Sequence, residues 1–331
     1  MTVLVTGGAG YIGGQMVYAL IDAGERVVVL DNLSTGHRWA VAASVPLVVG
    51  ESGDQPLVSR LIREHDVEAI IHFAASLIVP DSVCDPLGDY RNNTVNSRAL
   101  IECAIESDVR HFIFSSTAAV YGNRPTIPAD EEAPAQPISP YGWSELMTEI
   151  MLRDASRAHD LRHVALRYFN IAGADPQART GQSSKAATHL IKVAAEAALG
   201  LRPKLDVFGI DYPTPDGTCI RDYIHVSDLV GAHLHALRYL RSEGPSLTLN
   251  CGYGQRLFGS RSDQHGQTRL RRRFRDRARR AARGRSRLHR RGRRAPAHRA
   301  WLAAALRRSF ADRDPCARLG APPLGTVPTR R

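Results

Sequence analysis

The sequence predicts an α/β protein with a doubly wound parallel sheet of the Rossmann type, and three observations predict it. A short apolar segment, residues 2–6, runs directly into the glycine-rich stretch 7–13. Apolar, strand-like segments then alternate with helical patterns up to about residue 175, which is the rhythm of βαβ units. Several of these segments are rich in Val and Ile at consecutive positions, as in strands that helices cover on both faces.

The elements divide into two parts and a tail. Strands are predicted at residues 2–6, 26–31, 45–50, 68–74, 110–116 and 162–170, and later elements are two helices at 184–199 and 227–241 and a strand at 246–251. We therefore expect a dinucleotide-binding domain over residues 1–175 and a smaller substrate-binding part over 176–255. Residues 256–331 form an Arg-rich tail.

The first turn carries a dinucleotide-binding pattern. Gly7, Gly10 and Gly13 allow a tight turn, a close approach to a pyrophosphate, and packing of the following helix on the strand. The phosphates would lie at the helix N-terminus, where free N–H groups favour an anion. Asp31 ends the second strand about 20 residues later, the place of an acid that binds the adenosine ribose. Because this acid would repel a 2′-phosphate, we expect NAD and not NADP.

The charge of the chain is unevenly distributed. Residues 1–255 hold 20 Lys and Arg against 29 Asp and Glu, whereas residues 256–331 hold 24 Arg and 4 Asp, with no Lys or Glu. The tail also has no Ile, Met or Tyr, so it cannot bury enough apolar surface to fold, and we expect it to be disordered. Arginine clusters can bind nucleic acid. Here no aromatic interleaving or known motif accompanies them, so we expect no nucleic-acid partner.

The composition also indicates a cytoplasmic, metal-free protein. No run of 18 apolar residues predicts a membrane helix, and the first apolar stretch lacks the basic flank of a secretory signal. The five cysteines, at positions 84, 103, 219, 251 and 316, form no CxxC pair. An odd number without such spacing is typical of reduced thiols rather than disulfides or a zinc site.

Two segments carry residues suited to chemistry at a carbon that bears a hydroxyl group. Residues 114–122 end a predicted strand, and residues 139–149 begin a helix at Pro140. The hydroxyl of Thr117 and the phenol of Tyr141 could bind one substrate hydroxyl. A phenolate could accept its proton while hydride leaves the same carbon for a nicotinamide. Taken alone, these residues are explained equally well without catalysis, as ordinary polar loop residues and a half-buried tyrosine.

Together these motifs resemble the extended short-chain dehydrogenase/reductase family, and within it the UDP-sugar 4-epimerases, over about residues 1–255. The matching stretches are residues 6–13, 31–34, 72–75, 92–93, 115–122, 139–141, 167–170, 211–214 and 221–228. The resemblance implies tightly held NAD, a UDP-sugar substrate and a homodimer. It also implies a mechanism that interconverts UDP-glucose and UDP-galactose. Tyr141 takes the 4-hydroxyl proton, hydride passes to NAD, and the 4-keto sugar rotates before hydride returns.

The resemblance assigns residues to each site, with Tyr141 and Thr117 as the catalytic pair. The implied cofactor site consists of Gly7, Gly10, Tyr11, Ile12, Gly13, Asp31, Asn32, Ser34, Thr35, Gly36, Glu51, Ser52, Phe73, Ala74, Ala75, Asn92, Thr117, Tyr141, Glu145 and Phe169. The implied substrate site consists of Thr117, Tyr141, Asn170, Leu190, Phe208 and Arg221. An arginine beside a diphosphate also follows from charge and geometry.

The chain departs from the family at two places. Glu145 stands where the family has a lysine, four residues after the tyrosine and on the same helix face. The lysine holds the nicotinamide ribose and lowers the phenol pKa, whereas a carboxylate raises it. After Gly254 the family's two helices and its Pro-Arg-Arg-x-Gly-Asp element are missing, so the substrate part is incomplete. The tail composition is typical of a GC-rich coding sequence read out of frame, which predicts a frame break shortly after Gly254.

Alternatives to an active epimerase remain open. Glu145 and the missing C-terminal element are compatible with a catalytically impaired protein that binds NAD or a sugar nucleotide. Another extended member, such as a sugar-nucleotide decarboxylase, is a further alternative. Ala118 and Ala119 stand where a 4,6-dehydratase needs an acid pair, which favours an epimerase over a dehydratase.

Overall fold

The structure is a computed structural model that describes residues 2–123, 129–184, 189–203, 212, 214, 217–254 and 257–258. Of the predicted substrate residues, Phe208 lies outside the described residues, and so does Cys316. The tail 256–331, which the sequence predicts to be disordered, also lies outside them except for residues 257–258, which form a short paired strand and not the predicted disorder. The chain divides into two units, which are treated separately below. The first consists of residues 1–169, 174–185 and 226–252, and the second of 170–173, 186–225 and 253–331.

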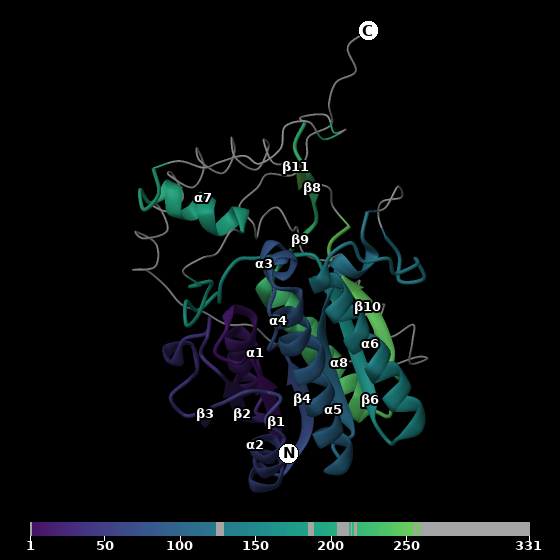
Figure 1. Ribbon diagram of the computed structural model, residues 1–331. Helices are drawn as coiled ribbons and strands as arrows, with labels where there is room; N and C mark the ends of the chain where they lie inside the picture. The colour runs from purple at the N-terminus through teal and green to yellow at the C-terminus, as the bar shows by residue number, and fades with distance from the viewer. Residues whose placement is uncertain are drawn as a thin grey trace, which may run out of the picture. The chain divides into compact units, whose positions relative to one another are not determined.

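The first unit is built on a seven-stranded sheet with the order β10-β6-β5-β4-β1-β2-β3, and all its strand pairs are parallel (Figure 1). The strands are β1 (Thr2–Thr6), β2 (Arg26–Asp31), β3 (Leu47–Val49), β4 (Val67–His72), β5 (His111–Thr117), β6 (Arg162–Tyr168) and β10 (Leu247–Cys251). The chain starts at β1 in the interior of the sheet, adds β2 and β3 on one side of it, and then adds β4, β5, β6 and β10 on the other side. This reversal of direction confirms the predicted doubly wound parallel fold.

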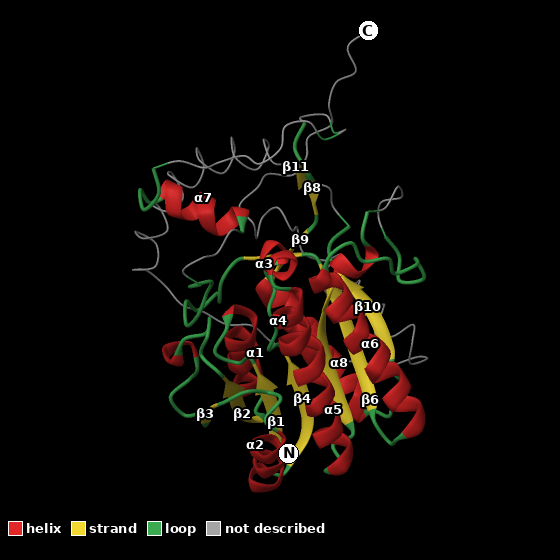
Figure 2. Ribbon diagram, in the orientation of Figure 1, coloured by secondary structure: helices red, strands yellow, loops and turns green. Residues whose placement is uncertain are grey.

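Helices cover both faces of this sheet (Figure 2). They are α1 (Tyr11–Asp22), α2 (Gln55–His65), α3 (Val79–Cys84), α4 (Pro86–Tyr90), α5 (Asn96–Glu106), α6 (Pro140–Ala158) and α8 (Val226–Arg241). Shorter turns are the 3₁₀-helices η1 (Arg38–Ala40) and η3 (Ala118–Tyr121) and the π-helix η2 (Arg91–Val95). Helices α2, α5 and α6 pack in one group, and α1 packs against α8.

The core explains why the strands are continuous apolar segments. All five residues of β1 are buried, and so are the last five of β2. Leu4, Ile70 and Phe112 are completely buried within one cluster, which α2 and α5 cover with Leu61 and Leu100. Burying each such side chain contributes about 1.5–3 kcal/mol, so the sheet and its helices form one stable layer structure.

Several predicted boundaries differ from the structure. The predicted strand 162–170 ends at Tyr168, and the next strand, β7 (Asn170–Ala172), belongs to the second unit. The predicted helix 184–199 is observed as α7 (Leu190–Ala198). Helix α8 and strand β10 were expected in the substrate-binding part but lie in the first unit. The reason is tertiary, because β10 pairs in parallel with β6 and α8 packs against α1.

The second unit is described by two short strand pairs and α7. Strand β7 pairs in parallel with β9 (Tyr223–His225), and β8 (Ile220–Arg221) pairs antiparallel with β11 (Leu257–Phe258). Asp222 joins the pairs, since its carboxylate accepts the backbone N–H of Tyr253 at 3.3 Å and of Gly254 at 2.9 Å. The main chain of residues 253–254 is thereby fixed beside β9.

Two further features concern membrane-spanning helices and the state of the cysteines. Among the residues described, no helix combines the length and the apolar character needed to cross a bilayer. The described cysteines, Cys84, Cys103, Cys219 and Cys251, are free thiols, as their spacing predicts.

Candidate active site

The turn between β1 and α1 accepts only glycine at its closest approaches. Gly7 has a φ of +70°, and a Cβ there would lie 2.7 Å from the backbone nitrogen of Ala74. A Cβ at Gly13 would lie 2.1 Å from the carbonyl oxygen of Gly7. The turn is fixed by hydrogen bonds from Gly7 N to Leu30 O at 2.9 Å and from Gly10 N to Gly7 O at 3.2 Å.

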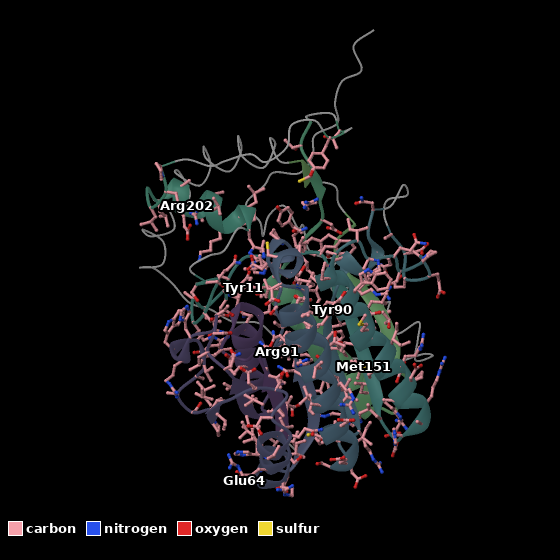
Figure 3. All side chains as sticks on the ribbon, in the orientation of Figure 1. Tyr11, Glu64, Tyr90, Arg91, Met151 and Arg202 are labelled. Atoms are coloured by element: carbon pink, nitrogen blue, oxygen red, sulfur yellow. The ribbon has the colours of Figure 1, made fainter. Side chains whose placement is uncertain are left out.

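The N-terminus of α1 fits a pyrophosphate. The helix begins at Tyr11 after Gly10, no side chain caps it, and its first turn holds no acidic residue. Its amide groups and dipole therefore favour an anion. Figure 3 labels Tyr11 near the upper end of α1, the end of the first unit toward which the strands run. Burial raises the pKa of Tyr11 above its ordinary value, so its phenol stays neutral.

Asp31 is held beside this turn at the end of β2. It is 7% exposed, and its two carboxylate oxygens accept the backbone N–H of Ala9 at 2.9 Å and of Leu33 at 2.8 Å. Each oxygen keeps a second lone pair that can accept a hydroxyl proton. A Cβ at Gly36 would lie 2.8 Å from the backbone of Ala9, so the loop after Asp31 lies directly against the glycine turn. These features fit the adenosine ribose of NAD.

We expect Asp31→Ala to weaken NAD binding by about 1.5–3 kcal/mol, because a charge-assisted hydrogen bond to the ribose is lost. The variant should also discriminate less against NADP, since the repelling carboxylate is gone. Titration calorimetry with NAD and NADP measures both effects. Val49→Ala on the neighbouring strand β3, half exposed, serves as the control. An unchanged NAD/NADP preference would show that Asp31 does not bind the ribose.

The loops after β2, β3 and β4 hold most of the other predicted cofactor residues of the first unit. Asn32 donates to Glu51 Oε1 at 3.1 Å, and Ser34 N donates to Asn32 Oδ1 at 2.9 Å. Phe73 N donates to Thr6 O at 3.0 Å, and the centre of the Phe73 ring lies 4.9 Å from the centre of the His233 ring. The exposure of the remaining members is mixed: Ser52 is buried, Ile12, Ala74, Ala75 and Phe169 are half-buried, and Thr35 is exposed.

The residues before and after these loops are fixed by polar contacts. His72 is buried between Thr6 Oγ1, at 2.6 Å, and Ser97 Oγ, at 2.9 Å. Burial lowers the pKa of His72 to about 4, so the ring is neutral and acts as a bridge. Asn92 lies in the π-helix η2 and donates to Ser76 Oγ at 2.9 Å. Such π-turns are frequent at functional sites.

Thr117 and Tyr141 meet at the carboxyl end of the sheet. Thr117 is the last residue of β5, and Tyr141 lies in the first turn of α6. That turn is started by Pro140 and by Ser139, whose hydroxyl caps the N–H of Gly142. A Cβ at Gly142 would lie 2.9 Å from Ala119 O, so glycine lets the helix start approach the loop after β5. The phenol of Tyr141 is hydrogen-bonded to Thr117.

Glu145 lies one helical turn after Tyr141 and is 2% exposed. Burial, and then the carboxyl groups of Glu149 and Asp89, raise the pKa of Glu145 well above 4.5. Burial, and then Glu145, raise the pKa of Tyr141 above 10.0, whereas the hydrogen bond with Thr117 lowers it. The effect of Glu145 on Tyr141 has the direction expected from the sequence.

The sequence did not single out four polar residues in the region of Tyr141 and Glu145, which are Asp89, Ser116, Glu149 and Arg167. Asp89 accepts from Ser144 at 2.9 Å, and Glu149 is bound by Arg167. A signal was present, since Arg167 directly follows the apolar residues Val164, Ala165 and Leu166 on β6. An arginine at such a position requires a buried acid as partner.

The predicted substrate residues Asn170, Leu190 and Arg221 belong to the second unit. Asn170 N and Nδ2 both donate to Asp222 O, at 3.0 and 3.2 Å. Leu190 is the first residue of α7, and Arg221 ends β8. Their binding of substrate stays a prediction.

Comparison with known proteins agrees with this geometry. The model of the NAD dependent epimerase/dehydratase family matches residues 3–252. The UDP-glucose 4-epimerase of Azospirillum brasilense is 59% identical over 253 residues, which are 76% of this chain and 73% of that protein. The structure resembles UDP-glucose 4-epimerase from Brucella ovis in complex with NAD, with a TM-score of 0.76 and 44% identity over 78% of this chain and 79% of that one. It also resembles the Bifidobacterium longum enzyme in complex with NAD⁺ and UDP, with a TM-score of 0.75 and 32% identity over 80% and 83% of the two chains.

Proposed function

The chain belongs to the NAD dependent epimerase/dehydratase family, and from that premise we propose that it is a UDP-glucose 4-epimerase. The reaction inverts the configuration at C4 of the sugar and so interconverts UDP-glucose and UDP-galactose. The observation that carries the proposal is the hydrogen-bonded pair of Thr117 and Tyr141 at the carboxyl end of a dinucleotide-binding sheet. A phenol and a hydroxyl at this place can hold one substrate hydroxyl and exchange its proton.

NAD is the cofactor, and the residues present fit it. The glycine turn and the N-terminus of α1 suit the pyrophosphate, and Asp31 suits the adenosine ribose. When bound, NAD supplies a reversible hydride acceptor at its nicotinamide ring. The remaining cofactor residues named above are proposed to line the same site, with Glu145 and Tyr141 on the nicotinamide side.

The chain's own groups would act on the proton and on the diphosphate. Tyr141 would accept the 4-hydroxyl proton of the sugar and return a proton after the sugar has rotated in the site. Thr117 would orient that hydroxyl. We assign the uridine diphosphate to Asn170, Leu190, Phe208 and Arg221. A guanidinium such as that of Arg221 can bind two phosphate oxygens at once, which suits a diphosphate.

The test is conversion of UDP-galactose by the purified chain. An epimerase forms UDP-glucose without added NAD, and denaturation of the protein releases its bound NAD. Bound NAD without turnover would instead establish the impaired binding protein, which the buried Glu145 beside Tyr141 favours as the second candidate. A decarboxylase would release carbon dioxide from a UDP-uronic acid and leave UDP-galactose unchanged.

We also propose that residues after Gly254 arise from a change of reading frame. The family match ends at residue 252, and the Arg-rich composition begins immediately afterwards. About a quarter of the Azospirillum relative lies outside the match. Translating the coding sequence beyond codon 254 in its other two frames tests this. A Pro-Arg-Arg-x-Gly-Asp element in one frame would support a frame break, and its absence from both would exclude one.

A homodimer is proposed through an apolar stripe on α6. Trp143, Met147 and Ile150 recur at helical spacing on α6 and are exposed by 42%, 38% and 39%. The hydroxyl of Thr94 in η2 contacts the sulfur of Met147, and the next residue along η2, Val95, is an exposed apolar residue. Contiguous apolar surface of this kind marks an interaction site. Because the stripe repeats on each copy, two copies can bury it against one another.

Met147→Glu should convert the dimer to a monomer. A charge in the centre of an apolar interface loses its hydration when the interface closes, which should weaken association by about a hundredfold or more. Sedimentation velocity over a range of concentrations measures the change. Val49→Glu, an exposed apolar residue on the edge strand β3, is the matched control and should leave association unchanged. Equal weakening by both variants would exclude the α6 stripe as the interface.

The free thiols in the described part of the chain support a cytoplasmic location, which we propose on that ground.

A further inference from the structure

A buried ion pair lies behind the catalytic pair. Glu149 is on α6, two helical turns after Tyr141, and Arg167 is on β6. Arg167 Nε donates to Glu149 Oε1 at 2.9 Å and Nη2 donates to Oε2 at 2.6 Å, with side chains only 9% and 7% exposed. This two-pronged geometry fixes the direction of both side chains.

The buried ion pair also contacts the end of β5, and so connects that strand to α6. Ser116 Oγ donates to Glu149 Oε1 at 2.5 Å. Ser116 and Arg167 are register partners in the parallel β5–β6 pair, so their side chains leave the same face of the sheet. Ser116 directly precedes Thr117, and Glu149 is on the helix that carries Tyr141. The carboxylate therefore joins the two backbone segments whose side chains must meet.

The other side of Arg167 holds the loop that follows Thr117. Its Nη1 donates to the hydroxyl of Tyr121 at 2.9 Å, and its guanidinium carbon lies 4.9 Å from the centre of the Tyr121 ring. Tyr121 ends the 3₁₀-helix η3, which begins immediately after Thr117. The Tyr121 hydroxyl in turn donates to Asn250 Oδ1 on β10 at 2.8 Å. Arg167 thus fixes the chain both before and after Thr117.

Stability alone is a weak explanation for such a pair. Removing two charges from water costs about as much as their attraction returns, and apolar residues of similar volume often stabilise a core equally well. What apolar residues cannot supply is directional contact with Ser116 and Tyr121.

We propose that Glu149 and Arg167 are positioning residues of the epimerase reaction, which hold the end of β5 against α6 so that Thr117 stays hydrogen-bonded to Tyr141. The inference rests on the proposed function, because it concerns the use made of Tyr141. It assigns the ion pair no contact with the sugar or with NAD.

Three variants of the full chain separate positioning from stability: Arg167→Met, Glu149→Gln, and both together. Arg167→Met leaves the Glu149 carboxylate buried without its guanidinium, so its thermal midpoint should fall. The double variant removes that charge, so its midpoint should recover. Turnover of UDP-galactose, with protein in excess so that slow rates are measurable, should stay reduced by about tenfold or more in both, since misplaced groups react slowly. The protein concentration that gives half of the maximal single-turnover rate should change little.

Hydrogen exchange gives a readout that does not depend on turnover. Peptides covering residues 112–123 and 139–150 should exchange faster in the single and double variants, and a peptide covering residues 2–22 should not change. Arg162→Met, at the other end of β6 where Arg162 pairs with Glu243, is the matched control and should alter neither segment.

Recovery of both stability and turnover in the double variant would overturn the proposal, and so would unchanged exchange in both segments. If the unmodified chain has no turnover, the proposed function fails, and the exchange pattern still decides whether the ion pair fixes the two segments. If Arg167→Met does not fold, Glu149→Gln and the double variant carry the same comparison.

Discussion

Glu145→Lys is expected to raise the rate of UDP-galactose conversion near neutral pH by at least about a hundredfold, equivalent to two pKa units of the Tyr141 phenol. In the present chain, burial and Glu145 both raise that pKa. An ammonium group on the same helix face lowers it, because an opposite charge favours the phenolate. It also offers a donor to the nicotinamide ribose. The comparison should be made in chains that carry a family-type C-terminal segment after Gly254.

The surroundings of residue 145 suit a cation better than an acid. Asp89, Glu145 and Glu149 bring three carboxyl groups into one buried region, and the guanidinium of Arg167 is bound to Glu149. With lysine at position 145, two acids would face two cations. Since a buried charge is tolerated only when it is paired, the substitution should also stabilise the fold.

The pH dependence follows from the same groups. The optimum for turnover should move downward, because a phenol of lower pKa is ionised at lower pH. Stability should respond as well. The folded state holds the proton of Glu145 above its ordinary pKa of 4.5, whereas the unfolded state releases it. The free energy of unfolding of the unsubstituted chain therefore falls as pH rises from 4.5 toward the raised value, and the Glu145→Lys variant lacks this loss.

Glu145→Gln is the control that separates removal of the acid from gain of the ammonium group. It should lose the same pH-dependent destabilisation and gain only part of the rate. Equal rates for all three chains would show that another group activates Tyr141. If none of them turns over while all bind NAD, the epimerase proposal gives way to the binding protein.

Gly13→Ala is expected to lower NAD affinity by at least about a hundredfold, because preorganised helix N–H groups hold the pyrophosphate only when the turn is closed. The added Cβ would lie 2.1 Å from Gly7 O and 2.8 Å from Gly7 C. These are backbone atoms, so the turn and the start of α1 must separate. The thermal midpoint should fall too, since α1 packs against α8 in the core.

Calorimetric titration with NAD and thermal unfolding measure the two effects of Gly13→Ala. Gly231→Ala is the matched control, because Gly231 lies within α8 and a Cβ there meets no atom within 4 Å among the described residues. That control should bind NAD normally and gain up to about 1 kcal/mol of helix stability. NAD binding unchanged by Gly13→Ala would remove the glycine turn from the cofactor site.

Much of the site could be predicted because its signals are local. The strand–glycine–helix order of residues 2–22 and the position of Asp31 at the end of the second strand follow from short-range spacing. The structure adds that Ala9 N of the glycine turn donates to the Asp31 carboxylate. Strands 2–6 and 26–31 coincide with β1 and β2 because both are continuous apolar segments. The end of β5 and the Pro-initiated start of α6 likewise placed Thr117 and Tyr141 on the correct elements.

What the tertiary structure decided depends on residues distant in sequence. The assignment of α8 and β10 to the first unit follows from the pairing of β10 with β6, which no local pattern specifies. The sequence also determined that Glu145 lies on the helix face of Tyr141. It did not determine that Asp89 and Glu149 raise the pKa of the Glu145 carboxyl group, or that Arg167 binds Glu149. Periodicity fixes which side chains share a face of one element, whereas the electrostatics of a buried site depend on which elements pack together.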